Sequence, residues 1–212
     1  MPCVSGSNTP GNPAGGLDDL GAVAAWGRER AVPVFSDECY AEFTWAGEPR
    51  TILEHGLEGL VAVHSLSKRS NLAGVLRRVL RRRPRPGALP ERGRAARRAH
   101  ARRAGPGGGD RRARRAHPRR DAAPAVRGGR LEVLRRALDT AGIEADLPGG
   151  GFYLWARAPD GDAWGLAGRL ADEAGALVSP GSSYGPAGAD RVRLAAVRSD
   201  TEIGLVARRL GV

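Results

Sequence analysis

The feature that most limits the fold of this chain is a central stretch that cannot build a core. Residues 76–130 contain twenty arginines, no lysine, and no Phe, Trp, Tyr or Ile. The stretch consists mainly of Arg, Ala, Gly and Pro, and its apolar residues follow neither a helical nor a strand period. Such a composition offers too little apolar surface to offset the conformational entropy lost on ordering. We therefore expect a disordered middle, residues 76–129, between two organised flanks.

The net charge of +11 over 212 residues comes from this stretch. It holds twenty basic and three acidic residues, whereas the rest of the chain holds fourteen basic and twenty acidic residues. A basic nucleic-acid-binding protein acting through residues 76–130 is therefore the alternative function from another class. Selected binding segments usually include lysine, and aromatic residues that stack on bases, and this one has neither. We expect no specific nucleic-acid partner.

The first flank, residues 1–75, has the pattern of an α/β domain. Apolar residues at helical spacing behind Asp18 and Asp19 predict a helix near residues 17–30. Two apolar runs follow, AVPVFSDE from Ala31 and GLVAVHSLS from Gly59. Both predict buried strands of a parallel sheet, with functional residues at their carboxyl ends.

The second flank, residues 130–212, continues to alternate between helix and strand. Helices are predicted at 130–142, 162–175 and 199–211, the last with Ser199 and Glu202 spaced as a capping box. Residues 143–159 predict a strand pair around a glycine turn, and two more strands are predicted at 176–181 and 190–197. We expect this flank to form a domain of its own.

The chain has a single lysine, Lys68, against thirty-three arginines, and it lies in the polar loop HSLSKRSNLAG after the second predicted strand. One interpretation is a solvated loop lysine. The other is a nucleophilic amine that forms a Schiff base, which arginine cannot do because its guanidinium stays protonated. The neighbours favour the second interpretation. Asp37 and Tyr40 lie in SDECY at a strand end, and Asn12 lies in the loop NTPGNPAG.

Taken in this order, NPAG, SDECY and HSLSK resemble the motifs of the pyridoxal-phosphate-dependent aminotransferases of class I/II, which have fold type I. The resemblance implies an α/β fold. Residues 1–75 would be the C-terminal part of the large, cofactor-binding domain with its parallel sheet, and residues 130–212 the small α+β domain. It further implies pyridoxal 5'-phosphate as cofactor and transamination between an amino acid and a 2-oxo acid.

The resemblance also implies a role for each matching residue at the cofactor. Lys68 forms the covalent link to the cofactor aldehyde and then transfers a proton. Ser65 binds the cofactor phosphate. Asp37 pairs with the pyridine nitrogen and keeps it protonated, so that the ring can accept electrons. Asn12 and Tyr40 hydrogen-bond the phenolic oxygen.

Substrate binding is implied by the strand VRLAAV, where the family has an arginine that grips the substrate α-carboxylate. Arg193 matches it best, and Arg191 and Arg198 are weaker candidates. SDECYAEFTW and HSLSKRSNLAG are most similar to actinobacterial N-succinyldiaminopimelate aminotransferases. This similarity implies N-succinyl-LL-2,6-diaminopimelate and 2-oxoglutarate as substrates, in lysine biosynthesis, and a homodimer.

The chain departs from this family in three places. The family begins with a long N-terminal part, and this chain starts after it. The family has a phosphate-binding arginine eight residues after its lysine, where this chain has Leu76, so the phosphate would be held weakly. Read one nucleotide later from GC-rich codons, residues 75–87 can give YSAGFSAGDPDLV, which suits the position after NLAG. We therefore interpret the chain as an N-terminally truncated aminotransferase with a frameshifted stretch at 76–129.

The remaining sequence features bear on the location of the protein in the cell and on metal binding. No run of eighteen apolar residues occurs, and MPCVSGSNTPGN lacks the layout of a signal peptide. Cys3, Cys39 and the four histidines lack metal-ligand spacing. We expect a cytoplasmic protein without a metal site and without a membrane partner.

Overall fold

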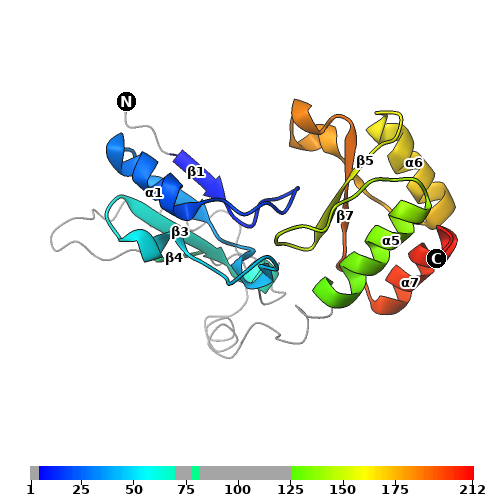
Figure 1. The fold of residues 1–212 in the computed structure, drawn as a ribbon, viewed down its shortest axis with the longest axis horizontal. Helices are drawn as coiled ribbons and strands as arrows, with labels where there is room; N and C mark the ends of the chain where they lie inside the picture. Colours follow the sequence, from blue (N-terminus) through cyan, green and yellow to red (C-terminus); the bar gives the residue numbers. More distant parts are fainter. Residues whose placement is uncertain (1–4, 70–77, 82–125) are drawn as a thin grey trace, which may run out of the picture. The chain divides into compact units, whose positions relative to one another are not determined.

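The structure is a computed structural model, and it describes residues 5–69, 78–81 and 126–212 (Figure 1). The chain divides into two compact units. Unit 1 comprises Met1–Pro10, Asp18–Glu42 and Glu48–Arg120, and unit 2 comprises Gly11–Leu17, Phe43–Gly47 and Asp121–Val212. Two short loops from the first flank of the sequence, residues 11–17 and 43–47, thus belong to unit 2.

Unit 1 is built on a four-stranded sheet with the order β1-β2-β3-β4. The strands β1 (Ser5–Asn8), β2 (Val34–Asp37) and β3 (Leu60–Ser65) are parallel, and β4 (Arg78–Arg81) is antiparallel to β3. The α-helix α1 (Leu20–Glu29) and the 3-10 helices η1 (Ala41–Phe43) and η2 (Ile52–His55) lie between the strands in sequence. This confirms the helix near 17–30 and both predicted strands. The strand β1 was not predicted, because SGSN contains no apolar run.

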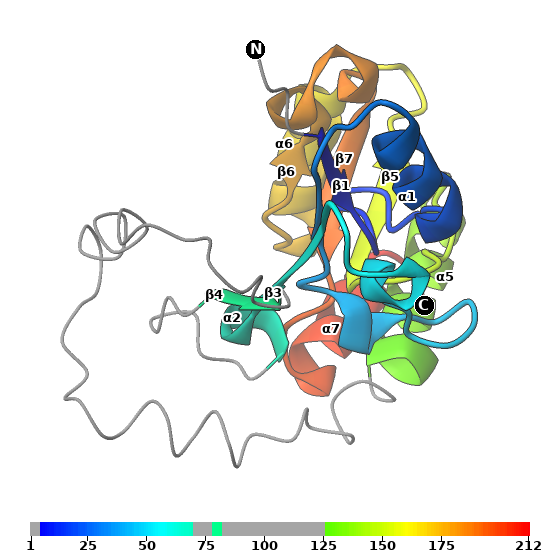
Figure 2. The same ribbon diagram turned by 90° about the vertical axis from the view of Figure 1, so that its left-hand side faces the viewer.

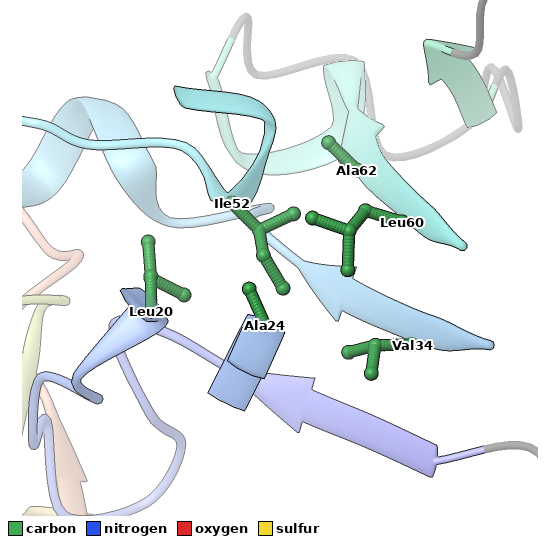
Figure 3. Close-up of a cluster of buried hydrophobic side chains, with 6 residues drawn as sticks. All are labelled: Leu20, Ala24, Val34, Ile52, Leu60 and Ala62. Atoms are coloured by element: carbon green, nitrogen blue, oxygen red, sulfur yellow. The ribbon is translucent and has the colours of Figure 1, made fainter. Parts of the chain in front are cut away.

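The core of unit 1 lies on one face of the sheet, where α1 and η2 pack against β2 and β3 (Figure 3). Asp19 caps the N-terminus of α1 by accepting a hydrogen bond from the Ala22 N–H at 2.9 Å. Residues of alternating positions in β2 and β3 then meet the apolar face of α1, as the period of a strand requires. The fully packed side chains are Leu20, Ala24, Val34, Ile52, Leu60 and Ala62.

Unit 2 is built on a three-stranded antiparallel sheet with the order β5-β7-β6. The strands are β5 (Tyr153–Arg157), β6 (Ser179–Pro180) and β7 (Arg191–Ala195). The helices are η4 (Val126–Leu131, a π-helix), α5 (Glu132–Thr140), α6 (Ala163–Ala174), η5 (Gly181–Tyr184), η6 (Pro186–Gly188) and α7 (Asp200–Arg209). All three predicted α-helices are present, and α5 and α7 lie side by side (Figure 1).

The two faces of the unit 2 sheet differ in chemistry. Leu154 and Leu194 are opposite each other in the register, as are Ala156 and Val192, and all four are buried on one face. The helices contribute the buried side chains Leu134, Leu138, Leu166, Leu170 and Ile203. The alternate residues of β5 and β7, which include Tyr153, Trp155 and Arg193, therefore share the other face.

Two local predictions differ from the structure. Residues 143–159 were predicted to hold a strand pair, but only β5 is a strand there, and its neighbour is β7, further along the chain. Arg78–Arg81 lie within the stretch that was expected to be disordered, and in the structure they pair with β3. Val79 and Leu80 give this short segment strand propensity that the average composition of the stretch conceals.

Most of the predicted frameshifted stretch lies outside the described residues. Across the part of the chain that the structure does describe, no helix is both long and apolar enough to span a membrane.

Candidate active site

Asp37 is the last residue of β2, at the carboxyl end of the parallel strands in unit 1. It lies opposite Asn8 of β1 and Val63 of β3 in the sheet register. The Asp37 carbonyl accepts hydrogen bonds from the Thr9 N–H at 3.1 Å and the Asn8 side-chain amide at 3.2 Å. The Oδ1 atom of its carboxylate accepts one from the Cys39 N–H at 3.1 Å. Backbone and side chain are thus both fixed, which gives this carboxylate a defined direction.

Ser65 and Lys68 follow from the neighbouring strand. Ser65 ends β3, and its hydroxyl accepts a hydrogen bond from the Ser67 N–H at 3.1 Å, at the start of the short helix α2 (Leu66–Arg69) (Figure 2). Lys68 lies on α2 and is exposed. Because β2 and β3 are parallel, Asp37, Ser65 and the segment that carries Lys68 lie at the same edge of the sheet.

Tyr40 and Glu38 occupy the turn after β2. Tyr40 is buried, as a residue with a fixed role would be. Glu38 is also buried, and its Oε1 atom accepts a hydrogen bond from the Ile52 N–H at 2.8 Å. Its Oε2 atom lies 3.5 Å from Nε2 of His64 on β3. The sequence analysis did not predict that Glu38 would fix this turn. The presence of a second acidic residue beside Asp37, directly after an apolar strand, could have indicated it.

Asn12 belongs to unit 2, in the loop of residues 11–17. The Gly11 N–H donates to the Gly16 carbonyl and the Gly15 N–H to the Gly11 carbonyl, both at 2.8 Å. The loop is joined to the turn before β5 because the Gly150 N–H donates to the Gly15 carbonyl at 2.9 Å. Gly15 has a φ of 70°, and a Cβ there would lie 2.3 Å from that of Pro148, so only glycine fits. This packing fixes the position of Asn12.

Arg193 on β7 meets Asn12 directly. Its Nη1 donates to Oδ1 of Asn12 at 2.8 Å. Its guanidinium carbon lies 4.2 Å from the ring centroid of Tyr153 and 4.9 Å from that of Tyr184. The two weaker candidates are engaged elsewhere. Arg191 contacts Asp190 and the Trp155 carbonyl, and Arg198 pairs with Glu202 at 3.8 Å while largely exposed.

The aromatic neighbours of Arg193 were missed by sequence reasoning. Tyr153 is in the segment PGGGFYLW and Tyr184 in the segment SPGSSYG. The alternation of β5 and β7 places Tyr153 and Arg193 on one face, but that pairing could be known only from the register. Tyr184 could have been noticed from the sequence, because it lies in a glycine-rich turn, where an aromatic ring is not expected to pack in a core.

The predicted residues divide between the two units. Asp37, Tyr40, Ser65 and Lys68 belong to unit 1, where they end β2 and β3 or follow these strands, and Asn12 and Arg193 belong to unit 2, where they are hydrogen-bonded. The first group fits pyridoxal phosphate by the chemistry of its donors, because a primary amine, a carboxylate, a phenol and a hydroxyl stand at one sheet edge. Leu76, where the family has a phosphate-binding arginine, lies outside the described residues. Among the residues that are described, no group of three or more His, Cys, Asp or Glu is placed to hold a metal ion.

Comparisons with known proteins point to the same family as the sequence motifs. Residues 7–104 match the family model "Aminotransferase class I and II". The chain is 38% identical over 216 residues to the 4-dedimethylamino-4-oxo-anhydrotetracycline transaminase OxyQ of Streptomyces rimosus, covering 96% of this chain and 58% of that protein. It is 36% identical over 227 residues to the probable aminotransferase Rv1178 of Mycobacterium tuberculosis, covering 96% of this chain and 50% of that protein.

A solved structure shows the same fold. The apo form of BacF from Bacillus subtilis superposes with a TM-score of 0.77 at 21% identity, covering 98% of this chain and 58% of that one. The fold is therefore that of the fold type I aminotransferases, of which the chain contains a part. In sequence the chain is similar to the class I and II aminotransferases, whose cofactor is pyridoxal phosphate. The chain spans about half the length of the curated relatives it matches.

Proposed function

We propose that this chain carries the lysine, the ring-nitrogen carboxylate and the carboxylate-binding arginine of a transaminase that exchanges an amino group between an amino acid and a 2-oxo acid. The observation that carries the proposal is the place of Lys68. The only lysine of the chain follows β3 directly, at the sheet edge where β2 ends in Asp37. A chance lysine would have no reason to stand at that edge.

Unit 1 supplies the groups that hold the cofactor and move protons. When bound, pyridoxal phosphate supplies an aldehyde that captures amines and a ring that accepts the electron pair left at the substrate Cα. Lys68 would hold the cofactor through its primary amine, and it is the group that would move a proton at the substrate Cα. The Asp37 carboxylate would pair with the ring nitrogen and would keep that nitrogen protonated. The Ser65 hydroxyl would bind the phosphate.

Unit 2 supplies carboxylate recognition. Nη1 of Arg193 is engaged by Asn12, and Nε of Arg193 is buried with no hydrogen-bond partner among the described residues. The Nε–Nη2 edge of the guanidinium is thus the side left for a planar oxyanion, and a bidentate carboxylate would satisfy a buried donor that is costly to leave unpaired. Asn12 and Tyr40 are assigned to the phenolic oxygen of the cofactor only as the family resemblance implies.

The domain assignment follows from these roles. Residues 1–75 are proposed to be part of the cofactor-binding large domain and residues 130–212 the small domain, in a cytoplasmic homodimer. For the substrate pair we propose N-succinyl-LL-2,6-diaminopimelate and 2-oxoglutarate, in lysine biosynthesis. The support is the similarity of SDECYAEFTW and HSLSKRSNLAG to that group of enzymes. The similarity to OxyQ favours a second candidate, amination of a ketone on a polycyclic substrate.

A single-turnover assay tests the transamination. Protein in excess is mixed with pyridoxal phosphate and an amino acid, and pyridoxamine phosphate and the 2-oxo acid are measured by chromatography. We expect formation above the rate of the free cofactor, and none above it with Lys68→Ala or with Lys68→Arg, which keeps the charge. Equal rates for the native chain and Lys68→Ala would refute the proposal. Comparing N-succinyl-LL-2,6-diaminopimelate with L-glutamate and a polycyclic amine as donors then separates the two substrate candidates.

A further inference from the structure

We propose that Tyr153, Tyr184 and Trp155 form an arginine clamp that orients the Arg193 guanidinium, so that these aromatic residues are positioning residues for carboxylate recognition. The inference rests on the proposed function in one respect, the carboxylate as ligand of Arg193. It deepens that function by assigning to three aromatic side chains the task of aiming the guanidinium.

The contacts of the clamp come from three separate segments of unit 2. Arg193 on β7 lies against Tyr153 on β5, which is 6% exposed, and against Tyr184 at the end of η5, which is 36% exposed. Both centroid distances are within the range in which an arginine cation is attracted by an aromatic ring. The side chain of Arg193 is therefore held by two rings and by one hydrogen bond to Asn12.

Trp155 supports the more exposed of the two tyrosines. It is the register partner of Arg193 across β5 and β7, so both side chains stand on the same face of the sheet. Its ring meets that of Tyr184 edge to face, with centroids 5.7 Å apart and planes at 90°. This is the arrangement that aromatic pairs prefer, and it fixes a ring that solvent would otherwise leave free to turn.

Two glycines make room for Trp155. A Cβ on Gly181 would lie 2.5 Å from Cη2 of Trp155 and 2.1 Å from the Gly188 carbonyl oxygen. A Cβ on Gly188 would lie 2.9 Å from Cζ2 of Trp155 and 2.6 Å from the Gly181 carbonyl oxygen. The SPGSSYGPAG segment is thus shaped around the indole, and that shape delivers Tyr184 to Arg193.

The physical effect of the clamp is preorganisation. A free arginine side chain has many rotamers, and ordering them at the moment of binding weakens affinity. Rings that already contact the guanidinium, with Asn12 fixing Nη1, leave its Nε–Nη2 edge directed for a bidentate ligand. Removal of the clamp should thus weaken carboxylate binding without touching the proton-transfer groups of unit 1.

The test compares Tyr184→Leu, which removes the ring, with Tyr184→Phe, which keeps it. Trp164→Leu is the matched control, because Trp164 is an aromatic residue of the same unit that is 69% exposed on α6. The first readout is the ¹H chemical shift of the Arg193 Nε–H in a ¹H–¹⁵N spectrum of the full chain, assigned by its loss in Arg193→Lys. The second is the KM for 2-oxoglutarate against kcat in the transamination assay.

We expect an upfield ring-current shift in the native chain that is reduced in Tyr184→Leu, where only the Tyr153 ring remains, and kept in Tyr184→Phe and Trp164→Leu. Loss of one cation–π contact should raise KM about fivefold in Tyr184→Leu, with kcat within about twofold. An Arg193 signal that is the same in Tyr184→Leu and in the native chain would overturn the clamp. If Tyr184→Leu does not fold, Tyr184→Met takes its place with the same expectations. A chain that shows the shift pattern but no transamination leaves the clamp standing and removes the proposed function.

Discussion

Unit 1 and unit 2 hold their polar candidate-site groups in different ways. In unit 1, Asp37 and Ser65 stand at the carboxyl ends of parallel strands and are fixed by backbone N–H groups. In unit 2, Arg193 stands in the middle of an antiparallel strand and is fixed by side chains, namely Asn12 and two tyrosine rings. The groups of unit 1 therefore depend on strand topology for their positions, whereas Arg193 of unit 2 depends on side-chain packing. Substitutions should therefore affect the two units differently.

The largest expected effect is that of Asp37→Asn on turnover. The amide keeps the shape of the side chain but cannot hold a proton on the ring nitrogen, so the main electrostatic support for charge development is lost. We expect turnover to fall about 100-fold or more, with the melting temperature nearly unchanged. Single-turnover kinetics and thermal unfolding followed by circular dichroism measure the two quantities. Native-like turnover in Asp37→Asn would mean that the strand-end carboxylate of unit 1 has no part in the chemistry.

A core substitution in unit 2 should have the next largest effect. It should lower the free energy of unfolding and not act on the chemistry directly. Leu154 is 0% exposed beneath the helices, so Leu154→Ala leaves a cavity and should cost about 2–5 kcal/mol of unfolding free energy. Phe35→Ala in unit 1 is the comparison, because Phe35 is 37% exposed and should cost much less. Urea unfolding of both variants gives the values. Equal losses would contradict the difference in packing between the two sheets.

The sequence predicted unit 1 and unit 2 to different extents. The strand ends at Asp37 and Ser65 were predictable because apolar runs end there, and parallel strands collect such ends at one edge. The cofactor roles of Asp37, Ser65 and Lys68 came from the family resemblance and stay predictions. Arg193 came from the family resemblance, since its sequence neighbours show only an ordinary strand arginine. The Tyr153 and Tyr184 contacts depend on strand register and on the turn around Gly181, which are long-range features that local patterns do not determine. At Arg78–Arg81 the average composition hid a short segment that pairs with β3.

Helix capping in unit 2 should give a smaller effect. Asp162 accepts hydrogen bonds from the N–H groups of Trp164 at 3.0 Å and Gly165 at 2.9 Å, which closes the N-terminus of α6. Asp162→Ala should therefore cost about 1 kcal/mol, and Asp162→Ser should recover most of it. Urea unfolding measures both. No difference between Ala and Ser at this position would show that the cap does not contribute.

The smallest expected effect is a dependence of stability on pH at α7. The pKa of Glu202 is lowered, first by its hydrogen bond with the Ser199 side chain and then by the one with the Ser199 backbone N–H. A carboxyl whose folded-state pKa is lowered stabilises the fold above its unfolded-state pKa and loses that contribution as the pH falls through the folded-state value. Glu202→Gln should thus be slightly less stable than the native chain at neutral pH, and the gap should close in acid. Melting curves from pH 7 to pH 3 test this, and a gap that widens in acid would contradict it.

The account depends most on Lys68 as the residue that bonds to the cofactor, and the composition of the chain makes this directly measurable. With one lysine, the only primary amines are Lys68 and the N-terminus. The full chain is incubated with pyridoxal phosphate, reduced with borohydride, digested and analysed by peptide mass spectrometry. The account predicts that the adduct lies on the peptide with Lys68 and is absent in Lys68→Arg. An adduct found only at the N-terminal amine, in equal amount in the native chain and in Lys68→Arg, would contradict it.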